Sequence, residues 1–207
     1  MLLRFLERRR SEVFSEEEFE KALFEMKDRF NQRKKSVLKK ADKSSVGGWD
    51  ERVIKLCEKI NSLEEYYTTS SCSGRVMVLK DQDKKGRNVF VFVSHDLVRE
   101  DFLKNVELKG NLKFKQEPFI FHVACRDLEG ARKLIDKAHS VGWKRAGVIS
   151  LGKNIIVEIN GNEKIDFPLV KKGKLLVSEE FMKISLERAN FNLEKNWDKI
   201  EKLGKEF

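Results

Sequence analysis

The densest group of chemically capable side chains lies in the ten residues YYTTSSCSGR, from Tyr66 to Arg75. Hydroxyls, a thiol, a glycine and an arginine follow one another directly before the apolar run of residues 76–79. Such a stretch can present hydroxyls and successive backbone N–H groups to a polar or anionic ligand, and Gly74 permits close backbone approach. The Arg75 guanidinium adds a fork suited to a carboxylate or phosphate. We therefore expect cofactor or substrate contacts from Thr69, Ser70, Ser71, Ser73, Gly74 and Arg75.

The same composition also fits a β-bulge or a tight loop at a strand end, held by local hydroxyl hydrogen bonds. Cys72, within this stretch, is a nucleophile only where a neighbouring group stabilises its thiolate. The sequence does not identify that group. Cys72 is thus a candidate catalytic residue if such a group lies beside it.

A second candidate is the segment EPFIFHVACR, from Glu117 to Arg126. Because side chains alternate between the two faces of a strand, His122 and Arg126 share one face with small or apolar neighbours. A single histidine on a strand is usually structural. Two donors on one face favour a surface that binds a ligand.

The elements that must position these residues read as mixed α and β without a βαβ rhythm. Helices are expected from Ser15 to about residue 41, from about residue 51 to 63, over 128–141 and over 178–205. Strands are expected at 76–79, 89–93, 119–124, 146–151, 155–159 and 165–170. We therefore predict a single α+β domain over residues 1–207, with a central, mostly antiparallel sheet, flanking helices and a non-Rossmann topology. The apolar stripe of the last helix indicates core or a seam of a homodimer.

The charge is strongly basic, since 43 Lys and Arg against 34 Asp and Glu give a formal charge of +9. An excess of this size is typical of nucleic-acid partners, although a highly charged surface can also lean basic by itself. The later part of the first helix, from Lys27 to Lys40, is basic with hardly any acids, and it reads either as a solvated face or as an arm that follows a phosphate backbone. The residues predicted to bind RNA are Arg33, Lys34, Lys35, Lys39 and Lys40.

Other site types are not indicated. The sequence has no dinucleotide fingerprint, Walker motif, nucleophile elbow or HExxH pattern. Its three cysteines, Cys57, Cys72 and Cys125, form no CxxC pair, which argues against a metal site or a disulfide framework. No apolar run approaches the roughly 18 residues that cross a bilayer, so we expect a cytoplasmic protein without a membrane partner.

Several segments in order, among them KADKSSVGGWDERV, YYTTSSCSGRVMVL and LKFKQEPFIFHVACRDLEGARKL, resemble the family of the third tRNA wybutosine-synthesising protein and its archaeal relatives. The resemblance covers about residues 30–203. It implies an S-adenosylmethionine-dependent methyltransferase that acts on N4 of the wyosine-type base at position 37 of tRNA(Phe), in the anticodon loop. It carries over Asp50 as a further site residue. On this basis His122 is the expected general base, with Asp50 as the alternative.

Two other functions stay open at this point. One is an RNA-binding module without a cofactor. The other is an enzyme acting on a small phosphorylated ligand, which Arg75 and the hydroxyls would hold.

Overall fold

The computed structural model describes residues 15–39, 50–82 and 89–207. The chain divides into two compact units, residues 1–43 and 44–207. The smaller unit contains helix α2 (Glu16–Leu38). The larger unit contains all the strands and the remaining helices of the described residues. Whether the two units form one domain over 1–207 stays a prediction.

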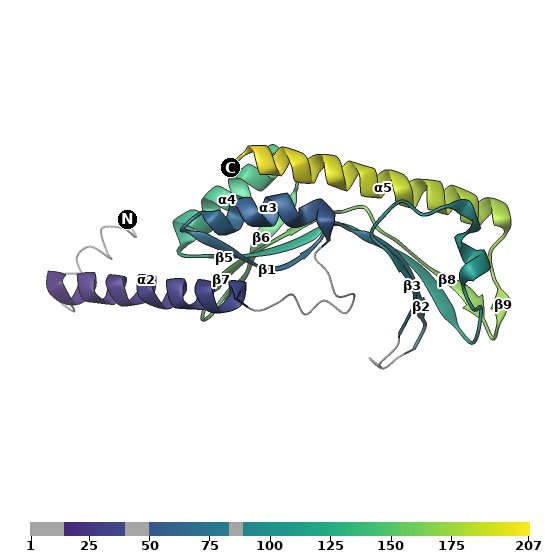
Figure 1. Ribbon diagram of the computed structural model, residues 1–207, viewed down its shortest axis with the longest axis horizontal. Coiled ribbons are helices and arrows are strands. Elements are labelled where there is room, and N and C mark those ends of the chain that lie inside the picture. Colours follow the sequence, from purple (N-terminus) through teal and green to yellow (C-terminus); the bar gives the residue numbers. More distant parts are fainter. Residues whose placement is uncertain (1–14, 40–49, 83–88) are drawn as a thin grey trace, which may run out of the picture. The chain divides into compact units, whose positions relative to one another are not determined.

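The larger unit is built on two antiparallel sheets rather than one (Figure 1). The first sheet has the order β1 (Tyr66–Cys72), β5 (Ile120–Cys125), β7 (Ile155–Asn160), β6 (Arg145–Leu151). The second has the order β3 (Phe90–Ser94), β2 (Arg75–Lys80), β4 (Leu112–Glu117), β8 (Ile165–Lys171), β9 (Lys174–Leu175). This confirms the predicted α+β class with antiparallel pairing and a non-Rossmann topology, and it divides the expected central sheet in two.

The chain passes between the two sheets at three places, which we call the seam: Ser73–Gly74, Pro118–Phe119 and residues 161–164. Strand pairing stops there for physical reasons. Gly74 has a φ of +104°, which side chains disfavour, and Pro118 has no N–H to donate to a ladder. The Gly161 N–H donates to the Phe119 carbonyl at 2.9 Å, so two of the crossings lie side by side.

Helices cover one side of the sheets. Helices α3 (Glu51–Ser62), α4 (Leu128–Ser140) and the C-terminal half of α5 (Glu179–Lys205) pack on the first sheet, and the other half of α5 packs on the second together with the short helix η1 (Glu100–Asn105) (Figure 1). At about 1.5 Å per residue, the 27 residues of α5 give it the length to reach across both sheets. Its predicted apolar stripe is core, because Leu186 and Leu193 are buried in one half and Ile200 and Leu203 in the other.

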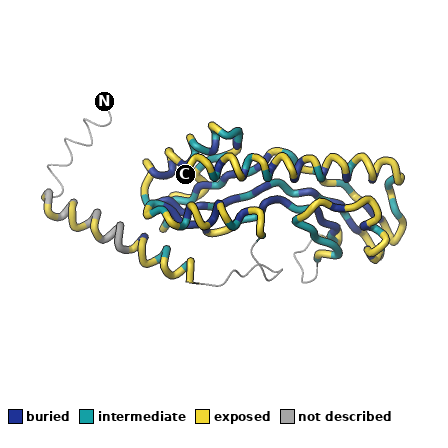
Figure 2. Tube along the Cα trace, turned by 45° about the horizontal axis from the view of Figure 1, so that its top comes forward, coloured by how far each residue is buried: buried dark blue, intermediate teal, exposed yellow. Residues whose placement is uncertain are grey.

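Burial follows this arrangement. The buried segments lie mainly in the strands and on the inner sides of the helices (Figure 2). At the seam, α5 contributes amides instead of apolar groups: the Asn192 Nδ2 donates to Gln116 Oε1 at 2.9 Å, and the Asn196 Nδ2 donates to the Asn192 carbonyl. The first of these buried hydrogen bonds fixes α5 against β4 where the sheets separate, and the second lies within α5.

Some sequence-based expectations concern residues outside the described ranges. The end of the predicted first helix, at residues 40 and 41, is one of them. Among the described helices, none combines the length and the apolar character needed to span a membrane.

Candidate active site

A cavity of about 470 Å³ lies at the seam, where residues from both sheets meet. Ser70, Ser71 and Cys72 reach it from β1 and Arg75 from the start of β2. The remaining lining residues are Lys115, Gln116, Glu117, Pro118, Ile120, Arg145, Asn160, Gly161, Lys164, Ile165 and Asp166. Ser70, Ser71 and Arg75, which were predicted to contact cofactor or substrate, therefore line the cavity together with the candidate catalytic residue Cys72.

Strand register explains why these side chains converge. In the first sheet Phe121, Val123 and Val157 face α3 and α4 in the core, so the alternate residues face away from these helices. Cross-strand pairing aligns Cys72, Ile120, Asn160 and Arg145 in one row, and all four line the cavity. The next row along the strands contains Ser70, His122, Glu158 and Gly147.

A β-bulge on β1 sets the facing of the hydroxyls. Pairing shifts between Thr68 and Ser70, which leaves Thr69 as the extra residue, and its Oγ1 donates to the His122 carbonyl at 3.3 Å. The bulge turns Ser70 to the same face as His122. The segment read from sequence as a loop or a bulged strand end is thus a strand with a bulge.

His122 is held by a carboxylate. Its Nε2 lies 2.7 Å from Glu158 Oε2, and both side chains are about one quarter exposed, at 25% and 29%. A carboxylate accepts a hydrogen from Nε2, which leaves Nδ1 as an acceptor when the ring is neutral. This is the arrangement of an oriented base. His122 itself lies one row beyond the cavity wall, next to Ser70.

Charges on the β4 side of the cavity are paired. The Arg75 Nε and Nη2 donate to Glu117 Oε2 at 3.0 and 2.8 Å, and its guanidinium lies over the Phe90 ring. Lys115 Nζ lies 3.6 Å from Glu117 and 3.4 Å from Asp166. The fork of Arg75 is therefore occupied by a carboxylate of the chain itself.

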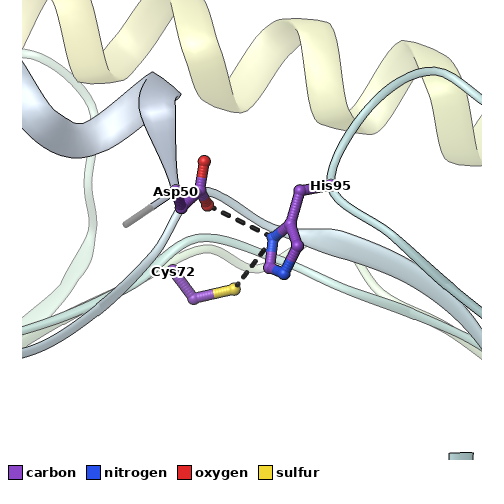
Figure 3. Close-up of side chains that lie close together, drawn as sticks. All are labelled: Asp50, Cys72 and His95. Atoms are coloured by element: carbon purple, nitrogen blue, oxygen red, sulfur yellow. Dashed lines mark hydrogen bonds and ion pairs between the residues drawn. The ribbon is translucent and has the colours of Figure 1, made fainter. Parts of the chain in front are cut away.

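A second cluster adjoins the cavity at Cys72 and joins three elements (Figure 3). His95, just after β3, places Nδ1 at 3.2 Å from Asp50 Oδ2, 3.1 Å from the Gly74 carbonyl and 3.8 Å from Cys72 Sγ. Asp50 is the N-cap of α3: its Oδ1 accepts from the Arg52 N–H and its Oδ2 from the Ser73 N–H at 2.6 Å. The cluster ties α3, the β1–β2 crossing and the end of β3 together.

This cluster has a distinct protonation state. The hydrogen bond with Asp50, followed by that with Cys72, raises the pKa of His95 to about 10 against the opposing effect of burial. Burial pushes the pKa of Asp50 upward, but hydrogen bonds with His95 and Ser73 outweigh it and leave this pKa below its ordinary value. At neutral pH the cluster is therefore an imidazolium beside a carboxylate.

The three donor atoms of Asp50, Cys72 and His95 lie within 4.8 Å of one another, and their types are those found in metal sites. In the observed arrangement, however, His95 Nδ1 faces three acceptors and so carries a hydrogen, whereas a nitrogen that ligates a metal must be deprotonated. Hydrogen bonding alone accounts for this cluster.

The other predicted site residues have structural partners. Ser73 is buried with its N–H on Asp50. Arg126 lies past the far end of β5, where its Nη2 donates to the Glu64 carbonyl at 2.7 Å. Gly74 is packed against α5, since a Cβ there would lie 2.9 Å from Leu193 Cδ2. Of the residues predicted to contact cofactor or substrate, Thr69, Ser73, Gly74 and Arg126 are not among those that line the cavity.

The residues predicted to bind RNA lie in the smaller unit. Arg33, Lys34 and Lys35 are on α2, and Lys39 follows its last turn. Lys40 lies outside the described residues.

Sequence reasoning missed His95, together with Glu158, Arg145 and Lys164. One signal was available for His95. If residues 76–79 and 89–93 form a hairpin, the antiparallel pairing of Val76 with Ser94 carries His95 back beside the SSCSGR segment.

Comparison with known proteins places this geometry in a family. The family model described as Methyltransferase TYW3 matches residues 32–207. A Xenopus laevis protein named tRNA wybutosine-synthesizing protein 3 homolog is 34% identical over 185 residues, which is 85% of this chain and 73% of that protein.

An archaeal relative from Thermococcus sibiricus is also 34% identical, over 84% of this chain and 92% of its own length. It is named tRNA(Phe) 7-((3-amino-3-carboxypropyl)-4-demethylwyosine(37)-N(4))-methyltransferase. Among solved structures, the PH1069 protein from Pyrococcus horikoshii matches with a TM-score of 0.78 and 32% identity, covering 87% of this chain and 94% of its own. The chain belongs to the TYW3 family of methyltransferases.

Proposed function

We propose that this protein transfers a methyl group from S-adenosylmethionine to N4 of a wyosine-type base at position 37 of tRNA(Phe). The reaction is the one named for the Thermococcus sibiricus relative, which matches this chain over most of both lengths. The observation that carries the proposal is the seam cavity. There the SSCSGR segment, residues 70–75, meets Ile120 of β5 and Asn160 of β7.

The residues of the cavity fit this cofactor. Its volume of about 470 Å³ lies within the usual range for small-molecule sites. The cofactor has an amino-carboxylate end, a ribose and an adenine. The wall offers charged groups of both signs, the polar residues Ser70 and Ser71, and the apolar surface of Ile120, Pro118 and Ile165. When bound, S-adenosylmethionine supplies an electrophilic methyl group on a sulfonium.

The side chains of the chain contribute mainly by alignment. In the proposed site the Ser70 hydroxyl hydrogen-bonds the bound groups, Ser71 contributes to the wall, and Glu117, held by Arg75, provides a carboxylate for an ammonium. The row of Cys72, Ile120 and Asn160 forms the floor. Positioning of two reactants in a dry cavity accounts for most of the acceleration expected of a methyl transfer.

A ring nitrogen that bears a proton must lose it when it gains a methyl group. In the proposal Nδ1 of His122 accepts this proton, because Nε2 of the same ring is held by Glu158 at 2.7 Å. Asp50 is a weaker candidate, since both of its oxygens already accept hydrogen bonds. Its role in the proposal is to hold the Ser73 backbone and, through His95, Cys72 beside the cavity.

The nucleic acid is bound by charge and by its single-stranded loop. A base in the anticodon loop can be turned outward at less cost than a base in a duplex. In the proposal Arg33, Lys34, Lys35, Lys39 and Lys40 contact the phosphate backbone, which makes binding dependent on salt.

The direct test is incubation with a labelled methyl donor and tRNA(Phe) that lacks only this methyl group, followed by mass analysis of the nucleosides. We expect one added methyl on the tricyclic base. We expect His122→Ala to lower the rate by about 100-fold or more. A wild-type rate in that variant would refute the role of His122, and no label in the base would refute the function.

Calorimetry with S-adenosylmethionine separates the competing functions. Binding that weakens in Arg75→Ala supports the methyltransferase, because Arg75 holds Glu117 at the wall. Binding of tRNA without any cofactor heat would instead support an RNA-binding module.

A further inference from the structure

The seam cavity is lined by more cations than carboxylates. Four cations, Arg75, Lys115, Arg145 and Lys164, stand against two carboxylates, Glu117 and Asp166. Glu117 is paired with Arg75 and Lys115, and Asp166 is paired with Lys115. The cavity thus has an excess of positive charge that none of its own carboxylates offsets.

The excess lies on Arg145 and Lys164. Neither has an ion-pair partner among residues 15–39, 50–82 and 89–207. Arg145 begins β6 and is paired in register with Asn160, while Lys164 ends the crossing from β7 to β8. Arg145 therefore lies beside Asn160 in the sheet, and Lys164 follows Gly161 along the chain. All four residues line the cavity. Two unpaired cations and an amide at one cavity wall form a receptor for an anion.

The proposed substrate brings one anion into the site. The base named for the Thermococcus sibiricus relative carries a 3-amino-3-carboxypropyl chain at its position 7. When N4 is seated for methyl transfer, this chain lies close to the cavity because it belongs to the same base. Its carboxylate is flat, and the fork of an arginine matches two such oxygens at once.

We propose that Arg145 and Lys164 form the subsite for the carboxylate of this side chain, so that they select the tailed base over the same tricyclic base without the tail. The proposal rests on the proposed function and adds to it the residues that read the substrate. Arg75 is excluded from this role because its fork already holds Glu117. A site built for a charged group discriminates strongly against an analogue that lacks it, since its own polar groups are then left without partners.

The test compares two tRNAs that differ only in the aminocarboxypropyl chain on the base at position 37. We expect wild type to have a higher kcat/KM on the tailed tRNA, and the double variant R145A/K164A to reduce the ratio of the two kcat/KM values by about 10- to 100-fold. Lys171→Ala, an exposed lysine at the end of β8 outside the cavity, is the matched control and keeps the wild-type ratio.

Contact with an RNA phosphate gives a different result. In that case the double variant loses kcat/KM equally on both tRNAs, and the slope of binding against salt becomes shallower. An unchanged ratio of this kind would overturn the subsite. If wild type methylates both tRNAs, the proposed function stands whatever the ratio. If it methylates neither, the proposed function fails and the subsite with it. Because both residues are exposed, thermal unfolding of the double variant should match wild type.

Discussion

Loss of the proton on His95 will remove folding free energy from the larger unit as pH rises above neutrality. Hydrogen bonds with Asp50 and Cys72 raise the pKa of His95 from 6.5 to about 10 in the folded chain. The folded state therefore binds this proton more tightly than the unfolded state does. The stabilisation is complete below pH 6.5, declines as the pH rises, and is lost above about pH 10.

The size of the effect follows from the same two values. At about 1.4 kcal/mol per unit, the difference between 6.5 and about 10 sets an upper bound of roughly 5 kcal/mol. The His95 side chain keeps 28% of its surface exposed. Solvent therefore screens the pair, and we expect about 2 kcal/mol.

The assay is urea unfolding of wild type and His95→Gln, followed by the fluorescence of the buried Trp143. The free energy of unfolding of wild type should exceed that of the variant by about 2 kcal/mol more at pH 6.5 than at about pH 10. In an Asp50→Asn background this pH dependence should largely disappear. A difference between wild type and His95→Gln that stays constant over this range would refute the reasoning.

Two further predictions concern the seam and the base. Gly74→Ala should lower the free energy of unfolding by about 1–3 kcal/mol, because φ is +104° and a Cβ would lie 2.9 Å from Leu193 Cδ2 and 3.1 Å from the Glu117 carbonyl; an unchanged melting temperature would contradict this packing. Glu158→Gln should lower kcat of methyl transfer by about 10- to 100-fold, since the amide no longer orients and stabilises the His122 imidazole; a wild-type kcat in single-turnover experiments would rule out that role.

The fold was largely accessible from sequence because its elements are strongly patterned. The stripe of α5, with Leu186 and Leu193 repeating at helical spacing, predicted a long buried helix that the structure contains. The division into two sheets was not accessible in the same way. Each strand was visible, but Gly74 and Pro118 act on pairing between distant segments, and a sequence pattern does not report which strands pair.

Part of the candidate site could also be predicted from the sequence. The SSCSGR segment was identified by composition, and its residues Ser70, Ser71, Cys72 and Arg75 line the cavity. By alternation Arg126 shares a strand face with His122, yet it lies four residues further along the chain, just past the end of β5, where it donates to the Glu64 carbonyl. Alternation along a strand predicts which face of the sheet a side chain lies on. Whether that side chain reaches a cavity depends on how the strand pairs with its neighbours, which the local sequence does not show.

Glu158 and Arg145 illustrate the same limit. Both belong to the hairpin β6–β7, whose role in the site arises only from its pairing with β5. Nothing in their local sequence distinguishes them from the many other charged residues of the chain.

The most direct measurement is a crystal structure of the protein with S-adenosylhomocysteine, the product of the methyl donor. The account predicts density for the ligand in the seam cavity, in contact with Ser70, Ser71 and the Ile120–Asn160 floor. A second hollow of similar size, about 480 Å³, lies between residues 98–101 and α5 at Leu186, Glu187 and Asn190. Density there, with the seam cavity empty, would contradict the account.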